Sequence, residues 1–232
     1  MKAFLLAAGV GSRLKPITDD TPKCMVPIAG RPMLDHWFDA LADAGVDEVL
    51  VNVHHFATTV AEHVETRVGP PVVRLSYEPE LLGSAGTLVD NRSWVDAEKF
   101  FLVCNADNLT DFDVRSLISF HEAGSAPATL TVFRTDRPSE VGIVEVDDEG
   151  VMVGFQEKPR RPRSCLANAG IYAFAPALLD ELHGRPPLDL GYDLIPRLVG
   201  RARVLPIAGY FRDIGTVGAY HSALEEWPAV AP

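Results

Sequence analysis

The residues best suited to chemistry stand near the start of the chain, where an apolar stretch leads into a glycine loop. Lys2–Ala8 is a β-type run, Gly9-Val10-Gly11-Ser12-Arg13 follows it directly, and Lys23 comes ten residues after Arg13. Glycines lack a Cβ, so the oxygens of a phosphate can approach the backbone N–H groups of such a loop. Cationic side chains then neutralise the group that the amides orient. The pattern predicts a strand end that holds a polyphosphate.

Two other phosphate-binding loops do not fit this stretch. A dinucleotide-binding loop requires a third glycine where the chain has Leu14, and a Walker A loop requires a Gly-Lys-Ser or Gly-Lys-Thr ending that is missing here. Two glycines are also compatible with a simple tight turn after the first strand. A simple turn does not account for the other residues gathered in the loop, which are Arg13, Pro16, Thr18, Pro22, Lys23 and Pro27.

Further candidate residues follow strand-like runs later in the chain. Asp107 ends an apolar run, and Asp213 stands beside Ile214-Gly215 before a predicted helix. A lone aspartate at such a position is more often a helix cap or a turn residue, but two carboxylates from distant strand ends are suitable ligands for one Mg²⁺. Lys158 follows a strand and precedes Pro159, although most lysines are solvated surface residues.

Positioning these residues requires alternating strands and helices in the first half of the chain. Apolar spacing predicts helices over Met33–Ala44, Thr58–Val68, Leu88–Trp94 and Val114–Ala123. β-Rich runs predict strands over Lys2–Ala8, Glu48–Val53, Val72–Tyr77, Lys99–Cys104 and Ala128–Arg134. Short strands separated by helices predict an α/β fold with a mostly parallel sheet and right-handed crossovers.

The second half of the chain has a different pattern. Val141–Val146 and Val151–Glu157 flank a turn-rich connection and predict an antiparallel hairpin. Further strands are predicted over Ala167–Phe174 and Ala202–Pro206, and amphipathic helices over Leu190–Val199 and Gly218–Trp227. No linker of flexible composition separates the halves, so we expect one domain over residues 1–232.

Composition restricts the class of protein. The 232 residues are 47% hydrophobic and 23% charged, as in an ordinary globular protein, and no apolar stretch approaches the length of a membrane span. The formal net charge of −11 argues against a nucleic-acid groove. Three well-separated cysteines suggest neither disulfides nor a zinc site. We therefore expect a cytoplasmic monomer or homodimer that contacts neither nucleic acid nor membrane.

Six segments in order resemble the sugar-1-phosphate nucleotidyltransferases, and together they reach from Lys2 to about His221. Any one of them is weak, whereas the ordered set is specific. They are Leu5–Thr18 with Pro22-Lys23, Leu82–Thr87, Asn105-Ala106-Asp107, Val141–Val144, Phe155–Pro159 with Asn168–Tyr172, and Asp213–Thr216. The resemblance implies a Rossmann-like α/β/α sandwich with a mixed, mostly parallel central sheet and a small antiparallel excursion on the sugar side.

The resemblance also implies a reaction, in which an NTP and a sugar 1-phosphate give an NDP-sugar and pyrophosphate with Mg²⁺ as cofactor. The implied catalytic residues are Arg13, Lys23, Asp107, Lys158 and Asp213, with Asp107 and Asp213 as metal ligands. Nucleotide binding is implied for Leu6, Ala8, Gly9, Gly11, Ser12, Arg13, Lys23, Gly83, Ser84, Gly86, Thr87 and Asp107. Sugar binding is implied for Gly142, Glu157, Lys158, Asn168 and Gly170. The resemblance further implies that residues 1–135 mainly bind the nucleotide and residues 136–232 mainly the sugar phosphate.

The choice of substrates stays open at this stage. We expect a short form without a C-terminal β-helix extension, which resembles the mannose- and heptose-1-phosphate guanylyltransferases and the muramic-acid uridylyltransferases. The segment Leu82–Gly86 favours the guanylyltransferases. Departures such as Ala106 for glycine, Cys24 and Val217 for proline and Val141 for an aromatic residue are compatible with another acceptor. The alternatives are uridylyl, thymidylyl or adenylyl transfer to another sugar or cyclitol 1-phosphate, cytidylyl transfer to phosphocholine, and a catalytically silent NDP-sugar-binding relative. Neither His54 nor His55 is given a role.

Overall fold

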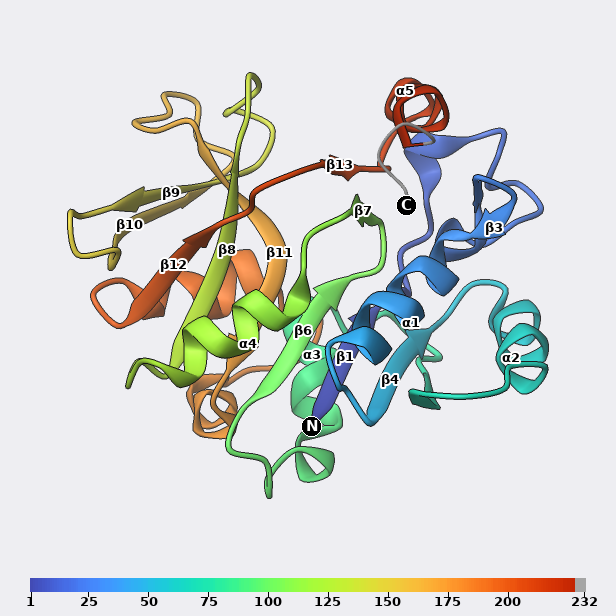
Figure 1. The fold of residues 1–232 in the computed structure, drawn as a ribbon, viewed down its shortest axis with the longest axis horizontal. Helices are drawn as coiled ribbons and strands as arrows, with labels where there is room; N and C mark the ends of the chain where they lie inside the picture. Colours follow the sequence, from blue (N-terminus) through green and yellow to red (C-terminus); the bar gives the residue numbers. More distant parts are fainter. Residues whose placement is uncertain (228–232) are drawn as a thin grey trace. The chain divides into compact units, whose positions relative to one another are not determined.

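The computed structural model describes residues 1–227, which group into two compact units built from non-contiguous segments. Among these residues, the first unit contains Met1–Leu81, Cys104–Val114 and residues 209–227, and the second contains Leu82–Val103 and Arg115–Ala208. Figure 1 shows the path of the chain. The expectation of one domain with a division at residue 135 stays a prediction.

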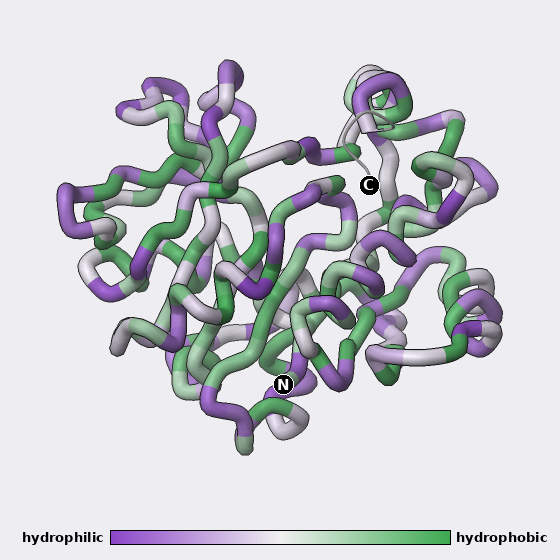
Figure 2. The backbone as a smooth tube through the Cα atoms, in the orientation of Figure 1, coloured by the Kyte–Doolittle hydropathy of each residue, from purple (hydrophilic) through white to green (hydrophobic). Residues whose placement is uncertain are grey.

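The first unit is organised around parallel strands. β1 (Lys2–Leu6) pairs with β4 (Glu48–Val53), which pairs with β5 (Val72–Tyr77). Ala3, Phe4 and Leu5 are fully buried, which agrees with the continuous apolar run in the sequence. β6 (Phe101–Asn105) contributes its last two residues to this unit, and Cys104 among them is fully buried. The hydrophobic colouring of these strands can be followed in Figure 2.

Helices of the first unit follow their apolar spacing. α1 (Met33–Asp43) buries Met33, Leu34, Trp37, Phe38 and Leu41 on one face and ends before Gly45, whose φ of +78° suits a glycine. The other helices of this unit are α2 (Ala57–Glu65) and α5 (Val217–Glu226).

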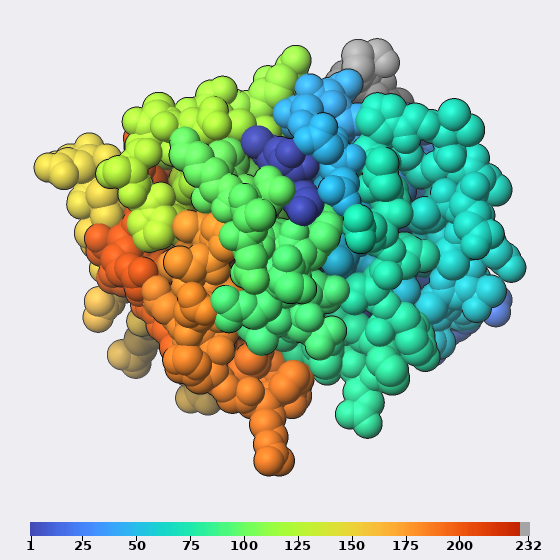
Figure 3. Space-filling view, turned by 90° about the horizontal axis from the view of Figure 1, so that it is seen from below, coloured from blue at the N-terminus to red at the C-terminus, as the bar shows by residue number. Residues whose placement is uncertain are grey.

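The first residues of the chain, dark blue in Figure 3, lie at the surface, where the terminal ammonium is 2.5 Å from Asp47 Oδ2.

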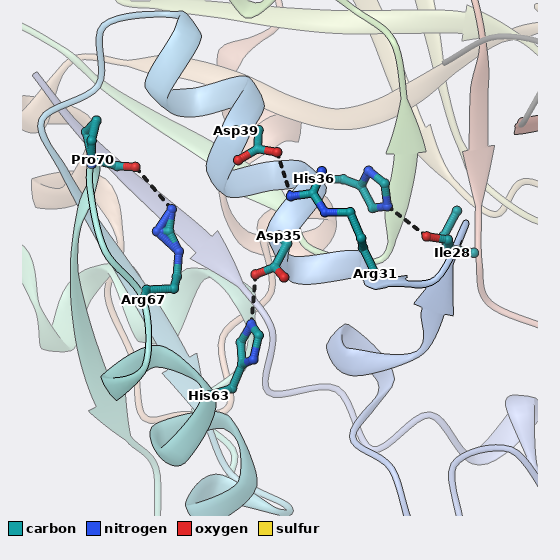
Figure 4. A network of polar contacts seen from close by, with 8 residues as sticks. All are labelled: Ile28, Arg31, Asp35, His36, Asp39, His63, Arg67 and Pro70. Atoms are coloured by element: carbon teal, nitrogen blue, oxygen red, sulfur yellow. Dashed lines mark hydrogen bonds and ion pairs between the residues drawn. The ribbon is translucent and has the colours of Figure 1, made fainter. Parts of the chain in front are cut away.

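A set of polar contacts fastens α1 to its neighbours (Figure 4). His63 Nε2 on α2 lies 2.7 Å from Asp35 Oδ1, and Arg31 donates to Asp39 at 2.6 Å. His36 Nε2 lies 3.0 Å from the Ile28 carbonyl oxygen. The last two contacts join α1 to the short hairpin of β2 (Pro27–Ile28) and β3 (Arg31–Pro32), which follows the glycine loop. These contacts are structural.

The second unit has a mainly antiparallel arrangement. β11 (Leu166–Phe174) pairs with β8 (Ala128–Arg134) and with β9 (Gly142–Val146), and β9 forms a hairpin with β10 (Met152–Glu157). β12 (Ala202–Pro206) runs parallel to β8. The expected α/β class with a mixed sheet is confirmed, as is the antiparallel excursion. α3 (Ser84–Asp90) and α4 (Val114–Glu122) are its regular helices.

Two sequence-based helices differ from the structure. The helix expected over Leu88–Trp94 begins earlier, as α3, and gives way to a 3₁₀ turn at Arg92–Trp94. The amphipathic α-helix expected over Leu190–Val199 is wrong in type: a π turn over Leu190–Leu194 leads into a 3₁₀ helix over Ile195–Leu198. Ile195 keeps α-helical backbone angles, with φ −57° and ψ −40°. Pro196 has no backbone N–H to donate to the carbonyl four residues earlier, so a regular α-helical ladder cannot run through it.

Among residues 1–227, the structure contains no helix long and apolar enough to cross a membrane.

Candidate functional site

The glycine loop takes a fixed conformation that depends on Gly11. Its φ is +68°, and its carbonyl accepts hydrogen bonds from Leu14 N and Thr18 Oγ1, both at 2.8 Å. A Cβ on Gly11 would stand 3.0 Å from Thr18 Cγ2 and 3.2 Å from Lys23 Cβ. Gly9 has open space where a Cβ would be. Gly11 therefore sets the shape of the loop, whereas Gly9 leaves its surface free for a ligand.

The loop begins from a strand end that a buried polar network holds in place. Ala7 N donates to Asn52 Oδ1 at 2.7 Å, and Asn52 Nδ2 donates to Glu78 Oε1 at 2.8 Å. Asn52 is 5% exposed and Glu78 is 1% exposed. The Leu6 carbonyl accepts from Ala106 N at 3.0 Å. The sequence did not reveal this network, because Asn52 in β4 and Glu78 after β5 carry no signal that they contact each other.

Asp107 and Asp213 are brought together by a short antiparallel ladder. β7 (Asn108–Thr110) pairs with β13 (Phe211–Asp213), and the Asp107 carbonyl accepts from Ile214 N at 2.8 Å. The Lys23 ammonium lies 2.5 Å from Asp107 Oδ2 and 3.9 Å from Asp213 Oδ1. Both carboxylates therefore face the Lys23 ammonium. That they hold Mg²⁺ stays a prediction.

Lys23 occupies a confined position in this group. Its side chain is 10% exposed, while the Asp107 and Asp213 side chains are 34% and 50% exposed. An ammonium so poorly hydrated is stable only beside anions, which the two carboxylates supply. A bound phosphate could share the same ammonium. The arrangement therefore provides one buried positive charge and two more accessible negative charges.

Arg13 reaches the same group from the loop. The structure places Arg13 Nη2 and the Asp213 carboxylate at Gly215, where an added Cβ would stand 3.2 Å and 2.9 Å from them. Gly215 thus permits both charged groups to approach the backbone. Arg13 is exposed, so its guanidinium is accessible to an anionic ligand. Ser12 and Ala8 flank the loop, Ala8 being 8% exposed.

Cys24 follows Lys23 at a position where the resembled family commonly has proline. Burial raises the pKa of the Cys24 thiol to about 12, and the neighbouring negative charge of Asp107 acts in the same direction. The thiol is therefore neutral at ordinary pH. A neutral buried thiol is a weak nucleophile, so Cys24 packs as a small apolar side chain.

A hydrophobic cluster packs together residues of the glycine loop, of β7 and of the segment after β13. It contains Leu14 of the loop, Leu109 of β7 and Ile214 after β13, together with Val26, Ile28, Met33, Tyr220, Ala223 and Trp227. Thr216 caps α5 by accepting from Ala219 N at 3.2 Å. The direct neighbours of Arg13 and Asp213, which are Leu14 and Ile214, are therefore anchored in one core.

The second unit holds the residues that the sequence associates with a sugar. A Cβ on Gly142 or on Gly191 would stand 2.7 Å from Glu157 Oε2, so the carboxylate lies against both glycines. Burial is the main cause that raises the pKa of Glu157; Lys158 lowers it, and Asp189 raises it. Gly142 therefore serves first as the space for Glu157, which no sequence motif shows.

Lys158 has an uncommon backbone for its residue type. Its φ is +45°, and its N–H donates to the Val141 carbonyl at 3.2 Å. The ammonium is 3.7 Å from Glu157 Oε1, and the side chain is 60% exposed. A left-handed non-glycine residue is strained and persists where its surroundings require it. The backbone of Lys158 thus restricts the direction of its side chain, and its exposed ammonium is accessible to an anionic ligand.

Asn168 and Gly170 lie at an irregularity of β11. The register of β11 against β8 shifts between Asn168 and Tyr172, and Gly170 has a φ of +70°. Asn168 Nδ2 donates to Tyr172 Oη at 2.6 Å, and Asn168 Oδ1 accepts from Gly170 N at 3.2 Å. Bulges of this kind re-aim side chains near functional sites.

The Gly83–Thr87 segment forms the start of α3, the simpler of the two interpretations of its sequence. Gly83 has a φ of +79°, and a Cβ there would stand 2.3 Å from the Leu188 carbonyl oxygen. That carbonyl accepts from Ala85 N and Gly86 N, and Ser84 Oγ donates to Asp189 Oδ2 at 3.0 Å. Thr87 is fully buried. Contact of Gly83, Ser84, Gly86 or Thr87 with a base stays a prediction.

The remaining polar candidates are structural. His54 Nδ1 lies 2.7 Å from the Glu78 carbonyl oxygen, and His55 packs against Phe56 with ring centroids 4.0 Å apart. Residues 1–227 contain no group of three or more metal-ligating His, Cys, Asp or Glu side chains. A metal held by Asp107 and Asp213 would need its other ligands from substrate and water, which is the usual way that Mg²⁺ binds beside phosphates.

These features match a known class of proteins. The model of the nucleotidyl transferase family matches residues 2–229, so the chain belongs to that family. Over 220 residues it is 34% identical to the mannose-1-phosphate guanylyltransferase catalytic subunit beta of Drosophila pseudoobscura pseudoobscura, covering 92% of this chain and 59% of the relative. The chain thus spans about three fifths of the length of the curated relative that it matches.

Solved structures show the same fold. UDP-glucose pyrophosphorylase from Acinetobacter baumanii has a TM-score of 0.87 at 23% identity, covering all of this chain and 94% of that one. HddC from Yersinia pseudotuberculosis, complexed with GMP-PN, has a TM-score of 0.81 at 24% identity, covering 97% of this chain and 99% of that one. The resemblance to sugar-1-phosphate nucleotidyltransferases and the Rossmann-like fold are confirmed.

Proposed function

We propose that this protein transfers a nucleotidyl group from an NTP to a sugar 1-phosphate, giving an NDP-sugar and pyrophosphate, with GTP and a mannose- or heptose-type 1-phosphate as the favoured pair. The observation that carries the reaction is the convergence of Lys23, Asp107 and Asp213, with Arg13 beside them. The favoured pair rests on the names of the curated relatives. Cytoplasmic location and a monomeric or homodimeric state stay predictions.

The first unit would bind the triphosphate. The open backbone at Gly9 admits phosphate oxygens, and Arg13 would hold the pyrophosphate that leaves. Lys23 would neutralise the region of the α-phosphate, moving its ion pair from Asp107 to the substrate. Asp107 and Asp213 would then hold Mg²⁺, which supplies charge neutralisation and alignment of the phosphates when bound. Their oxygens are ligands of the type that Mg²⁺ prefers.

The second unit would bind the acceptor. Lys158 would hold the sugar phosphate, while Glu157, Asn168 and the backbone of Gly142 and Gly170 would contact the sugar. The attacking atom is a phosphate oxygen of the acceptor, which forms a bond to the α-phosphorus as the bond to pyrophosphate breaks. A phosphate monoester is already anionic, so no side chain has to remove a proton. Catalysis then consists of positioning and charge neutralisation.

Steady-state kinetics of four variants test these roles. Asp107→Asn is expected to lower kcat at least ~100-fold, the scale of losing one preorganised electrostatic element. Asp19→Asn, which removes an exposed carboxylate paired with Lys15 in the loop after β1, is the control and should keep wild-type kcat. Lys158→Ala should mainly raise KM for the sugar phosphate, with Lys99→Ala as its exposed control. Near-wild-type turnover of Asp107→Asn at saturating Mg²⁺ would exclude Asp107 from the metal site.

A further inference from the structure

An arginine-rich segment between β10 and β11 has no place in the proposed reaction so far. Residues 158–163 read Lys-Pro-Arg-Arg-Pro-Arg, and the side chains of Arg160, Arg161 and Arg163 are exposed. We call these three residues the arginine loop. Its hydrophilic colouring can be followed in Figure 2. Four cations within six residues stand out in a chain whose net charge is −11.

The arginines of this loop differ from most others in the second unit. Arg201 donates to both carboxylate oxygens of Glu181, at 2.9 and 2.7 Å, and Arg92 lies 2.7 Å from Asp180. Within residues 1–227, the arginine loop makes no hydrogen bond or ion pair through a guanidinium. Neighbouring like charges repel, so the loop gains from an added anion.

The segment is stiff enough to act as a preformed site. Pro159 and Pro162 each fix one φ angle, and a residue before proline, such as Arg161, is restricted to extended conformations. The left-handed Lys158 adds a third fixed position. A restricted backbone loses less entropy when guanidinium groups bind a ligand. The three guanidinium groups on such a segment each offer planar, paired N–H donors, which suit the oxygens of a carboxylate or phosphate group.

The loop also borders an open depression whose lining includes Glu157, one of the proposed sugar residues. The depression has a volume of about 990 Å³ and is lined by Gln156, Glu157, Pro159, Arg160, Arg161, Pro162 and Arg163. This volume is at the upper end of the roughly 300–1,000 Å³ of small-molecule sites. Its lining contains Glu157, assigned to a sugar hydroxyl above, beside the arginine loop. A nucleic acid is disfavoured, because it needs a broad basic face.

We propose that the acceptor is a sugar 1-phosphate with a second anionic group, a carboxylate or phosphate away from the anomeric carbon, and that the arginine loop binds this group. The inference rests on the proposed function, because Lys158 is taken to hold the anomeric phosphate. The second anion would lie in the depression beside Glu157. The loop therefore selects among acceptors and takes no part in bond making.

Kinetics with three acceptors test the inference and identify the anion. Mannose 1-phosphate, mannuronic acid 1-phosphate and mannose 1,6-bisphosphate are compared with GTP, and then with the other NTPs, in the wild type and in Arg160→Gln/Arg161→Gln/Arg163→Gln. We expect a KM at least ~10-fold lower for one of the doubly anionic acceptors than for mannose 1-phosphate, as befits a charge-assisted contact. The triple variant should lose this preference while keeping kcat and the KM for mannose 1-phosphate within about threefold.

Two controls separate recognition from bulk charge. The triple arginine-to-lysine variant keeps the charge and loses the planar, paired N–H donors, so it should lose most of the preference. Arg137→Gln removes an exposed charge elsewhere in the unit and should change nothing. Turnover of mannose 1-phosphate without preference for either doubly anionic acceptor would overturn the inference and leave the proposed function standing. No turnover with any acceptor or NTP would overturn the proposed function, and the inference with it.

Discussion

The two glycines of the loop provide a sharp test, because they are two residues apart and have opposite structural roles. The perturbation is the addition of one methyl group, in Gly11→Ala and separately in Gly9→Ala. At Gly11 the methyl group meets Thr18 and Lys23 and the backbone is left-handed. At Gly9 it meets nothing within 4 Å, and φ is not in the left-handed range.

The expected magnitudes follow from these environments. A left-handed conformation costs an alanine about 1–2 kcal/mol, and crowding at 3.0 Å and 3.2 Å adds about 1–3 kcal/mol unless neighbours shift. Gly11→Ala should therefore lower the free energy of unfolding by about 2–5 kcal/mol, a large part of a typical 5–15 kcal/mol. Gly9→Ala should leave it unchanged or raise it by up to about 1 kcal/mol.

Substrate binding should be affected in Gly9→Ala, although its stability is not lowered. In the proposed function the open backbone at Gly9 receives phosphate oxygens, so the added methyl group should raise KM for the NTP about tenfold or more. KM for the sugar phosphate should stay unchanged, because the change lies in the loop. Gly9→Ala would thus be a folded protein with a nucleotide-binding defect.

The assays are urea unfolding and steady-state kinetics on both variants and the wild type. Equal m-values would show that the compactness of the folded and unfolded states is unchanged. A Gly11→Ala protein as stable as the wild type would refute the assigned loop conformation. A destabilised Gly9→Ala protein would refute the open space at Gly9, and a stable one with unchanged KM for every NTP would refute its contact with phosphate.

Three further predictions concern the surroundings of the site. Burial raises the pKa of Glu157, so the folded state keeps a proton that the unfolded chain releases. The stability of the wild type should therefore fall relative to that of Glu157→Gln as the pH rises from the ordinary glutamate pKa through the folded one. Urea titrations from about pH 4 to 7 measure this difference, and parallel stability curves would contradict it. Asn52→Ala removes the hydrogen bonds to Ala7 and Glu78 and should cost about 1–3 kcal/mol by urea unfolding. Asn52→Asp keeps the acceptor for Ala7 but faces Glu78 with a second buried carboxylate, so it should cost at least as much at neutral pH. No loss in either variant would remove the network from the account. Thr216→Ala should cost about 1 kcal/mol in the same assay and Thr216→Ser much less, since only the former removes the cap of α5; equal losses would argue against the cap.

Much of the fold could be predicted from the sequence, because the spacing of apolar residues indicates where helices and strands form. α1 was expected over Met33–Ala44 and spans Met33–Asp43, while β4, β5, β8 and β12 have the expected bounds. The helix at 190–198 failed because one proline outweighs an amphipathic pattern. β7 and β13 were missed, since three-residue strands depend on their partner rather than on their own residues.

The sequence predicted only part of the candidate site. Asp107 and Asp213 were paired from the resemblance, and the structure places both near Lys23. No pattern in the sequence indicates that Glu78 is buried or that Gly191 makes room for Glu157. Such contacts join residues that are distant in the chain, so only the folded structure reveals them.

Pyrophosphate release tests the central claim most directly. The purified protein is incubated with Mg²⁺, one of the five common NTPs and one of a panel of sugar and cyclitol 1-phosphates, with omission of either substrate as the control. The account predicts pyrophosphate release only when both substrates are present, with equal amounts of an NDP-sugar and the fastest turnover with GTP. Tight binding of an NDP-sugar without pyrophosphate release from any pair would contradict it and identify a silent binding protein instead.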